Sequence, residues 1–258
     1  MTTVAEALSV LDDLEAGRLR AASPDPSAPD GWAVDPDVKR AILACFADRT
    51  LLDFEAGPLT FRDRVGVTPR DVRGGPWRIV PGGTSVRRGA YLAPGVVVMP
   101  PSYVNIGAHI GADTMVDSHV LVGSCAQIGS RVHLSAGVTI GGVLEPPGAR
   151  PVIVEDEAFI GAGCSLLDGV LVGSRAVLAA GVSLTGTSRL YDLVGERILT
   201  GTVEAPLVVP PGSVVVPGAR VLEGAFAREH GLAIATALVV KQRDSRTDAR
   251  VALEDALR

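Results

Sequence analysis

Side chains that can carry protons gather between Met99 and Gly129, in the stretch MPPSYVNIGAHIGADTMVDSHVLVGSCAQIG. The stretch contains His109, Asp117 and His119, together with a second aspartate between the two histidines. Carboxylates and imidazoles are common general acids and bases in enzymes, and histidines also bind zinc. The stretch therefore predicts a site for proton transfer or for a metal, and the elements that position it decide between the two.

The composition limits the kinds of partner. The chain has 258 residues and a formal net charge of -5, which argues against non-specific binding to nucleic acid. The N-terminal stretch MTTVAEALSVLDDLEAGRLR is acidic and unlike a signal peptide, and no apolar run approaches the roughly 20 residues of a membrane span. Three widely spaced cysteines favour reduced thiols. We therefore expect a cytoplasmic protein that binds neither nucleic acid nor a membrane.

Aliphatic residues recur every six positions over most of the chain. A six-residue period fits neither an α-helix nor a strand, and it is typical of a parallel β-helix, in which each hexad forms one flat side of a coil. Gly, Asn, Asp and Ser at the corners tolerate left-handed torsions. We expect a mainly β fold, a left-handed parallel β-helix. The periodic residues are Val80, Val86, Leu92, Val98, Val104, Ile110, Val116, Val122, Ile128, Leu134 and Ile140, then Val154, Ile160, Leu166, Val172, Leu178 and Leu184, and last Val209, Val215 and Val221.

The part before the repeat has a helical pattern. Residues 1–77 are expected to form a small helical domain. One helix is predicted from Val4 to Arg20, where leucines recur on one face. A second helix is predicted to begin at Pro36, because Asp35 is a good N-cap and proline is favoured at the first helical position.

The repeat itself is interrupted twice. Residues 78–222 are expected to form the β-helix, with loop insertions near 141–153 and 186–206. Residues 223–258 are expected to form a C-terminal extension of strand and helix, in which residues 249–257 have the pattern of a short amphipathic helix.

The repeat also contains specific sequence motifs in a fixed order. MPPSYVNIGA, TMVDS, GSCAQIG and GGVLEP follow in that order, and VIVEDEAFIGA, SRLYD and PPGSVVVPG come after them. This combination resembles the tetrahydrodipicolinate N-succinyltransferase family, from roughly Arg78 to Arg258 and more loosely before. The resemblance implies transfer of succinyl from succinyl-CoA to the amine of 2-amino-6-oxopimelate, the open form of tetrahydrodipicolinate, on the route to diaminopimelate and lysine. It also implies a homotrimer with active sites between adjacent subunits.

Three residues match the substrate site of that family. Asp117 in TMVD matches its acidic residue, which would accept a proton from the substrate amine or orient it, because an ammonium group cannot attack a thioester. Without the resemblance, an aspartate at a corner more often bonds its own turn. Arg78 and Arg87 match basic positions that would hold the carboxylates of an amino-dicarboxylate, and a solvated surface role is the alternative.

The resemblance also implies a coenzyme site. The insertion GGVLEPPGARP would cover the pantetheine arm of the acyl-CoA, and lysine or arginine side chains would bind its phosphates. The acyl-CoA is a co-substrate, and no permanently bound cofactor and no metal are expected. The residues expected at the coenzyme are Gly141, Gly142, Ala179, Lys241, Arg243 and Arg246.

Two positions depart from the family pattern. His119 stands where the family has tryptophan, and it is expected to join the catalytic site beside Asp117 or to reshape it. The stretch FIGAGCS places Gly163, Cys164 and Ser165 where the family has an Arg-Ser-Glu triplet, so the glutamate proposed as a catalytic partner is missing. Cys164 has no basic neighbour in the sequence and is not expected to be a nucleophile.

Three alternatives to a succinyltransferase function stay open. A diverged N-acetyltransferase would use acetyl-CoA on the same or a related amino-dicarboxylate in a specialised pathway. A non-catalytic trimeric solenoid subunit would keep the fold alone. A zinc hydratase of the gamma-class carbonic anhydrase type would use His109, His119 and His133, although their spacing fits such a site poorly.

Overall fold

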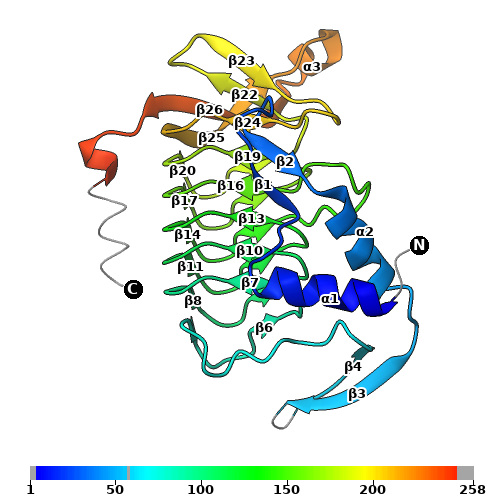
Figure 1. Cartoon of the computed structure of the whole chain (residues 1–258). Helices are drawn as coiled ribbons and strands as arrows, with labels where there is room; N and C mark the ends of the chain where they lie inside the picture. Colours follow the sequence, from blue (N-terminus) through cyan, green and yellow to red (C-terminus); the bar gives the residue numbers. More distant parts are fainter. Residues whose placement is uncertain (1–3, 57–58, 249–258) are drawn as a thin grey trace.

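The computed structural model describes residues 4–56 and 59–248. Its N-terminal part contains two helices and two short hairpins, and the helices pack on one side of a tall solenoid (Figure 1). A separate apolar cluster joins the helices to the solenoid residues Ile106 and Cys125. The elements are α1 (Val4–Glu15), β1 (Ala22–Pro24), β2 (Trp32–Val34), α2 (Pro36–Cys45), β3 (Leu51–Ala56) and β4 (Leu59–Arg64).

Both predicted N-terminal helices are present. The Asp35 side chain caps α2 by accepting hydrogen bonds from the backbone N–H groups of Asp37 and Val38. Helix α1 ends before the predicted boundary, because Gly17 follows it with φ 73°, a conformation that stops helices. The two hairpins were not predicted: β1 lies in a proline-rich stretch, and β4 is mostly exposed and shows no alternation of burial.

The solenoid is a left-handed parallel β-helix with three flat faces (Figure 1). Face 1 comprises β5 (Arg78–Ile79), β8 (Val97–Val98), β11 (Met115–Val116), β14 (His133–Leu134), β17 (Phe159–Ile160) and β20 (Val177–Leu178). Face 2 comprises β6 (Ser85–Val86), β9 (Tyr103–Val104), β12 (Leu121–Val122), β15 (Thr139–Ile140), β18 (Ser165–Leu166) and β21 (Ser183–Leu184). Face 3 comprises β7 (Tyr91–Leu92), β10 (His109–Ile110), β13 (Gln127–Ile128), β16 (Ile153–Val154), β19 (Leu171–Val172) and β24 (Val208–Val209).

Like residues stack over like from coil to coil. Val116 pairs with Val98 in the coil before it and with Leu134 in the coil after it. The inward residue of each strand is almost fully buried from Val86 to Val215, and together these residues form one continuous core. Burial of these aliphatic ladders is the main force that stabilises the solenoid.

The predicted repeat is wrong at its first and its last position. Ile79, not Val80, pairs with Val98, so the first coil is shifted by one residue and Val80 is only half buried. Val221 is 73% exposed, because it lies at the end of β25 (Ser213–Val221), beyond the part that continues the coil.

Left-handed torsions mark the corners, but not only at small residues. Gly137 and Gly163 have positive φ as expected. Seven larger residues at other corners have φ between 51° and 64°, a conformation that costs a residue with a Cβ about 1–2 kcal/mol. They are Asp113, His119, Cys125, Arg131, Glu157, Asp168 and Arg175.

A small sheet closes the upper end of the solenoid. It contains β22 (Arg189–Asp192), β23 (Arg197–Thr200), β25 and β26 (Ala233–Gln242), with α3 (Ala225–Glu229) between the last two. After β26, residues 243–248, here called the strap, lie against face 1. The predicted helix over residues 249–257 lies outside the described residues. No described helix combines the length and the apolar composition needed to cross a membrane.

Candidate active site

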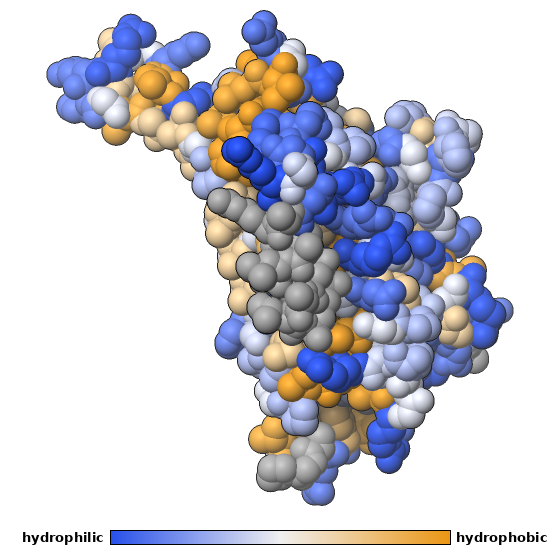
Figure 2. Space-filling model, turned by 90° about the vertical axis from the view of Figure 1, so that its left-hand side faces the viewer, coloured by the Kyte–Doolittle hydropathy of each residue, from blue (hydrophilic) through white to orange (hydrophobic). Residues whose placement is uncertain are grey.

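A groove of about 740 Å³ runs along face 1 from β11 to β25. Four of the predicted site residues, Asp117, Ala179, Lys241 and Arg246, line it together. The first two come from coils of the solenoid, and the other two from the end of β26 and from the strap. Figure 2 views the molecule from this side.

Asp117 lies at the lower end of the groove and is half-buried. It directly follows Val116, whose side chain points into the core. Its Oδ1 accepts a hydrogen bond of 2.7 Å from the backbone N–H of Ser118, and its backbone carbonyl accepts one of 2.8 Å from the Ser102 hydroxyl. Oδ2 accepts no hydrogen bond from a described residue. One carboxylate oxygen therefore holds the corner, and the other is available to a ligand.

The groove has a smooth apolar floor above Asp117. Gly161 and Ala179 follow the face 1 strands, and alanines occupy the adjoining corner positions. Phe159, which stacks on His133 with ring centroids 4.8 Å apart, and Val177 add apolar surface. Such a floor suits an extended and largely apolar ligand.

Two cations face the upper part of the groove. The Lys241 Nζ lies 2.8 Å from the Asp244 carboxylate, and hydrogen bonds from Lys241 and Thr247 hold the pKa of that carboxyl far below its ordinary value. The Arg246 guanidinium is exposed and makes no ion pair with a described residue. The groove can therefore attract an anionic group at this end.

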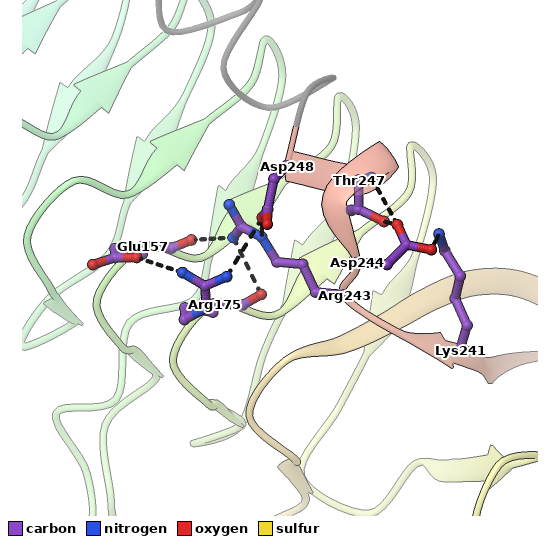
Figure 3. A network of polar contacts seen from close by, with 7 residues as sticks. All are labelled: Glu157, Arg175, Lys241, Arg243, Asp244, Thr247 and Asp248. Atoms are coloured by element: carbon purple, nitrogen blue, oxygen red, sulfur yellow. Dashed lines mark hydrogen bonds and ion pairs between the residues drawn. The ribbon is translucent and has the colours of Figure 1, made fainter.

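Arg243 holds the strap in place. Its Nη1 donates hydrogen bonds to the carbonyls of Glu157 and Arg175, and its Nε pairs with Asp248 (Figure 3). Its side chain is only 9% exposed and does not line the groove. Arg243 therefore holds the strap against the solenoid, and its contact with the coenzyme stays a prediction.

The two predicted substrate arginines lie outside the groove. Arg78 is exposed on β5, and the strand pairing places it two strand spacings, about 10 Å, from Met115 on face 1. Arg87 donates from Nε to the carbonyl of Val67 at 3.0 Å and pairs with Asp63. The Arg87 guanidinium therefore holds the segment that follows β4, and only Arg78 faces solvent on the side of Asp117.

Gly141 and Gly142 begin the loop that joins face 2 to face 3, away from the groove. Two buried cations anchor this loop. Lys39 of α2 is fully buried, donates to the carbonyl of Ala149 and has a pKa lowered by burial. Arg150 donates to the carbonyls of Gly169 and Pro206 and pairs with an aspartate of the N-terminal part. These contacts hold the last residues of the loop, Ala149 and Arg150, in place.

Comparison with known proteins decides the family. The family model for the hexapeptide repeat of succinyl-transferases matches residues 151–186. A 2,3,4,5-tetrahydropyridine-2,6-dicarboxylate N-succinyltransferase of Dechloromonas aromatica is 41% identical over 263 residues, covering 100% of this chain and 90% of that protein. The protein of the same name from Idiomarina loihiensis is 43% identical, covering 96% of this chain and 87% of that protein. The chain belongs to this family of acyltransferases.

Solved structures show more distant likeness. A hexapeptide-repeat acetyltransferase from Vibrio cholerae, solved in complex with acetyl coenzyme A, is 18% identical to the chain. The match covers 60% of this chain and 71% of that one, with a TM-score of 0.38.

The two positions at which the sequence is expected to depart from the family lie outside the described groove. His119 is exposed at its corner, with φ 61°, and its backbone N–H donates to the carbonyl of Pro101 at 2.7 Å. Ser165 lies on β18 of face 2, where it pairs with Thr139. Cys164 is buried, which raises the pKa of its thiol and disfavours a nucleophilic role.

The three histidines lie on different sides of the solenoid. His109 is on face 3, His119 is at the corner between faces 1 and 2, and His133 is in the groove on face 1. Among residues 4–56 and 59–248, no group of three His, Cys, Asp or Glu side chains is placed to hold a metal ion. The zinc-hydratase alternative therefore has no ligand set in this part of the chain.

Sequence reasoning missed the apolar wall of the groove. Phe159, Val177 and Val214 are the outward residues beside the inward ones in the face 1 ladder. The step of a full coil, three hexads, links Phe159 to Val177, but the loop insertions lengthen the steps from His133 to Phe159 and from Val177 to Val214, so a fixed period does not reveal that these residues stack in one column. Thr247 was missed as well, and no repeat pattern marks its position in the strap.

Proposed function

We propose that the protein transfers the succinyl group of succinyl-CoA to the amine of tetrahydrodipicolinate in its open form, 2-amino-6-oxopimelate. The observation that carries this proposal is the groove on face 1. It combines a carboxylate with a free oxygen at one end, two cations at the other and an apolar floor between them. These are the features that an acyl-CoA and an attacking amine require.

The chemistry is a direct transfer. The neutral amine attacks the thioester carbon, a C–N bond forms and the C–S bond breaks. Asp117 accepts the proton that the amine loses, through the Oδ2 that makes no hydrogen bond to a described residue. The coenzyme leaves as a thiolate and takes up a proton. No covalent enzyme intermediate is required, which fits the buried thiol of Cys164.

The ends of both substrates match the charges around the groove. The pantetheine arm would lie on the floor formed by Gly161 and Ala179, where there is no large side chain to obstruct it. Lys241 and Arg246 would bind phosphates of the coenzyme, and Arg78 would bind a carboxylate of the acceptor. Arg243 would act indirectly, by fixing the strap that carries Arg246.

The complete site would form between subunits of a homotrimer. The groove is on face 1, whereas Gly141 and Gly142 lie at the corner between faces 2 and 3, so one chain does not bring them together. Large apolar side chains are exposed on the small sheet and α3 at the upper end, where Figure 2 shows a hydrophobic area. These side chains suit contact with further copies of the chain; they are Leu193, Val194, Ile198, Val221, Phe226, Leu232 and Ile234.

Competition between acyl donors tests the proposal. Purified protein is given tetrahydrodipicolinate with equal concentrations of succinyl-CoA and acetyl-CoA, and the products are separated and weighed by mass spectrometry. We expect the N-succinyl product, with kcat/KM for succinyl-CoA at least tenfold higher than for acetyl-CoA. A dominant N-acetyl product would assign the protein to the diverged acetyltransferases, and the absence of both products would contradict the proposal.

A further inference from the structure

A second cleft lies on the other side of the molecule. It has a volume of about 430 Å³ and opens between the hairpin β1–β2 and face 3 of the solenoid. Arg20 and Trp32 contribute from the N-terminal part, and His109 and Asp156 from the coils. None of these residues lines the groove on face 1, and the proposed acyl transfer uses none of them.

Opposite charges face this cleft without joining. The Nε of Arg20 donates to the Gln127 side chain at 2.9 Å, and its guanidinium lies 5.4 Å from the centre of the Trp32 ring. Its terminal nitrogens have no hydrogen bond or ion pair to a described residue. Asp156 attracts Arg20 electrostatically but forms no ion pair with it, and its Oδ1 accepts a bond of 2.8 Å from the backbone N–H of Ser130. The cleft thus holds a cation and an anion with space between them.

The rings of Trp32 and His109 form the remaining walls, and contacts within the chain hold both rings in place. The indole N–H of Trp32 donates to Glu155 at 2.9 Å, which fixes the plane of the ring. His109 stacks on Tyr91 with ring centroids 4.6 Å apart, and its buried Nδ1 has no hydrogen-bond partner among the described residues. Burial lowers the pKa of His109 to about 3, so its imidazole is neutral at pH 7.

We propose that this cleft is a binding site for a free α-amino acid. The ligand carboxylate pairs with the terminal nitrogens of Arg20, and its ammonium group pairs with Asp156. Its side chain lies against the Trp32 ring, beside the neutral imidazole of His109. A zwitterion pairs with both charged groups, whereas a simple anion would pair only with Arg20 and a simple amine only with Asp156.

Calorimetric titration of the full-length protein tests this site. Each of the twenty protein amino acids is titrated in turn, followed by the α-amide and the N-acetyl derivative of the tightest ligand. We expect at least one amino acid to bind with a submillimolar Kd. Each derivative lacks one charge and should bind at least tenfold more weakly, and saturating coenzyme A in the groove should leave the Kd unchanged.

Matched variants locate the binding. Asp156→Asn keeps the oxygen that accepts from Ser130 but loses the charge, so the Kd should rise at least tenfold. Asp168→Asn removes an exposed corner carboxylate elsewhere on the solenoid and should leave the Kd unchanged. The proposal is overturned if no amino acid binds, if the N-acetyl derivative binds as tightly as its parent, or if Asp156→Asn has no effect. None of these results depends on acyl transfer, so this proposal can fail while the proposed function stands.

Discussion

Asp117 serves both the structure and the proposed chemistry. A corner aspartate commonly bonds its own turn, and Asp117 does so through Oδ1. The alternatives that the sequence raised, a turn residue or a proton acceptor, are therefore compatible in one side chain. The same corner places His119 beside it in the chain but exposed, so participation of His119 in catalysis stays a prediction.

The buried imidazole of His109 predicts a pH-dependent stability. Its pKa is about 3 in the fold and about 6.5 in an unfolded chain, so between these values the unfolded state binds one more proton. Acidification through this window should lower the unfolding free energy by up to about 1.4 kcal/mol per pH unit. His109→Phe keeps a ring against Tyr91 and does not titrate. The unfolding free energy of this variant, measured with denaturant between pH 4 and 6, should therefore change less with pH than that of the wild type. The same pH dependence in both proteins would contradict a lowered pKa of His109 in the fold.

The corner at His119 predicts a stabilising substitution. Its φ of 61° is strained for a residue with a Cβ, and its side chain makes no hydrogen bond or ion pair with a described residue. His119→Gly should raise the unfolding free energy by about 1 kcal/mol, whereas His119→Val should lower it. Denaturant unfolding of both variants measures this, and equal stability would be the contrary result. If the imidazole joins the catalytic site as predicted, kcat of His119→Gly falls as well.

At the scale of elements, periodicity predicted the solenoid well because burial alone sets it. Each inward position must be aliphatic, so the six-residue period was visible from Val86 to Val215. The ends of the repeat were less predictable, since Val80 and Val221 fit the six-residue period in the sequence but do not occupy inward positions of a coil. The groove could be predicted only in part, because the strap that carries Arg246 folds onto face 1 through contacts of Arg243 with backbone carbonyls, which no sequence pattern encodes.

The strap predicts a selective effect on coenzyme binding. Arg243→Gln removes the hydrogen bonds to the carbonyls of Glu157 and Arg175, and so loosens the segment that carries Arg246. The KM for succinyl-CoA should rise about tenfold, the loss of about 1.4 kcal/mol of binding free energy, with little change in kcat. Arg131→Gln is the matched control, because it removes only the exposed ion pair of Arg131 with Glu157. A fall in kcat without a change in KM would argue against a positioning role.

At the scale of the molecule, the predicted site residues occupy two separate sides of one chain. The groove with Asp117 is on face 1, and the anchored loop after Ile140 joins face 2 to face 3. Because the groove and the loop lie on different sides of one chain, packing of copies side by side would bring the groove of one subunit to the loop of the next. Helix α2 anchors the loop through Lys39, which connects the N-terminal part of the chain to the proposed site.

Mixed trimers test this arrangement. Asp117→Asn damages the groove, and Gly148→Trp obstructs the loop at a position where an added Cβ meets no atom within 4 Å. Each variant alone should be nearly inactive. In trimers co-expressed from both, random assembly leaves about a quarter of the interfaces with two intact halves, so about a quarter of the wild-type rate should return. No recovery would place both halves of the site in one subunit.

The most direct test of the central claim is the rate of thiol release from succinyl-CoA with tetrahydrodipicolinate as acceptor. It is measured for the wild-type protein, for Asp117→Asn, which keeps the bond to Ser118, and for Asp168→Asn as the control corner. The account predicts turnover by the wild type and the control, and a fall in kcat of about 100-fold or more for Asp117→Asn. Equal rates for all three proteins, or no release by the folded wild type, would contradict it.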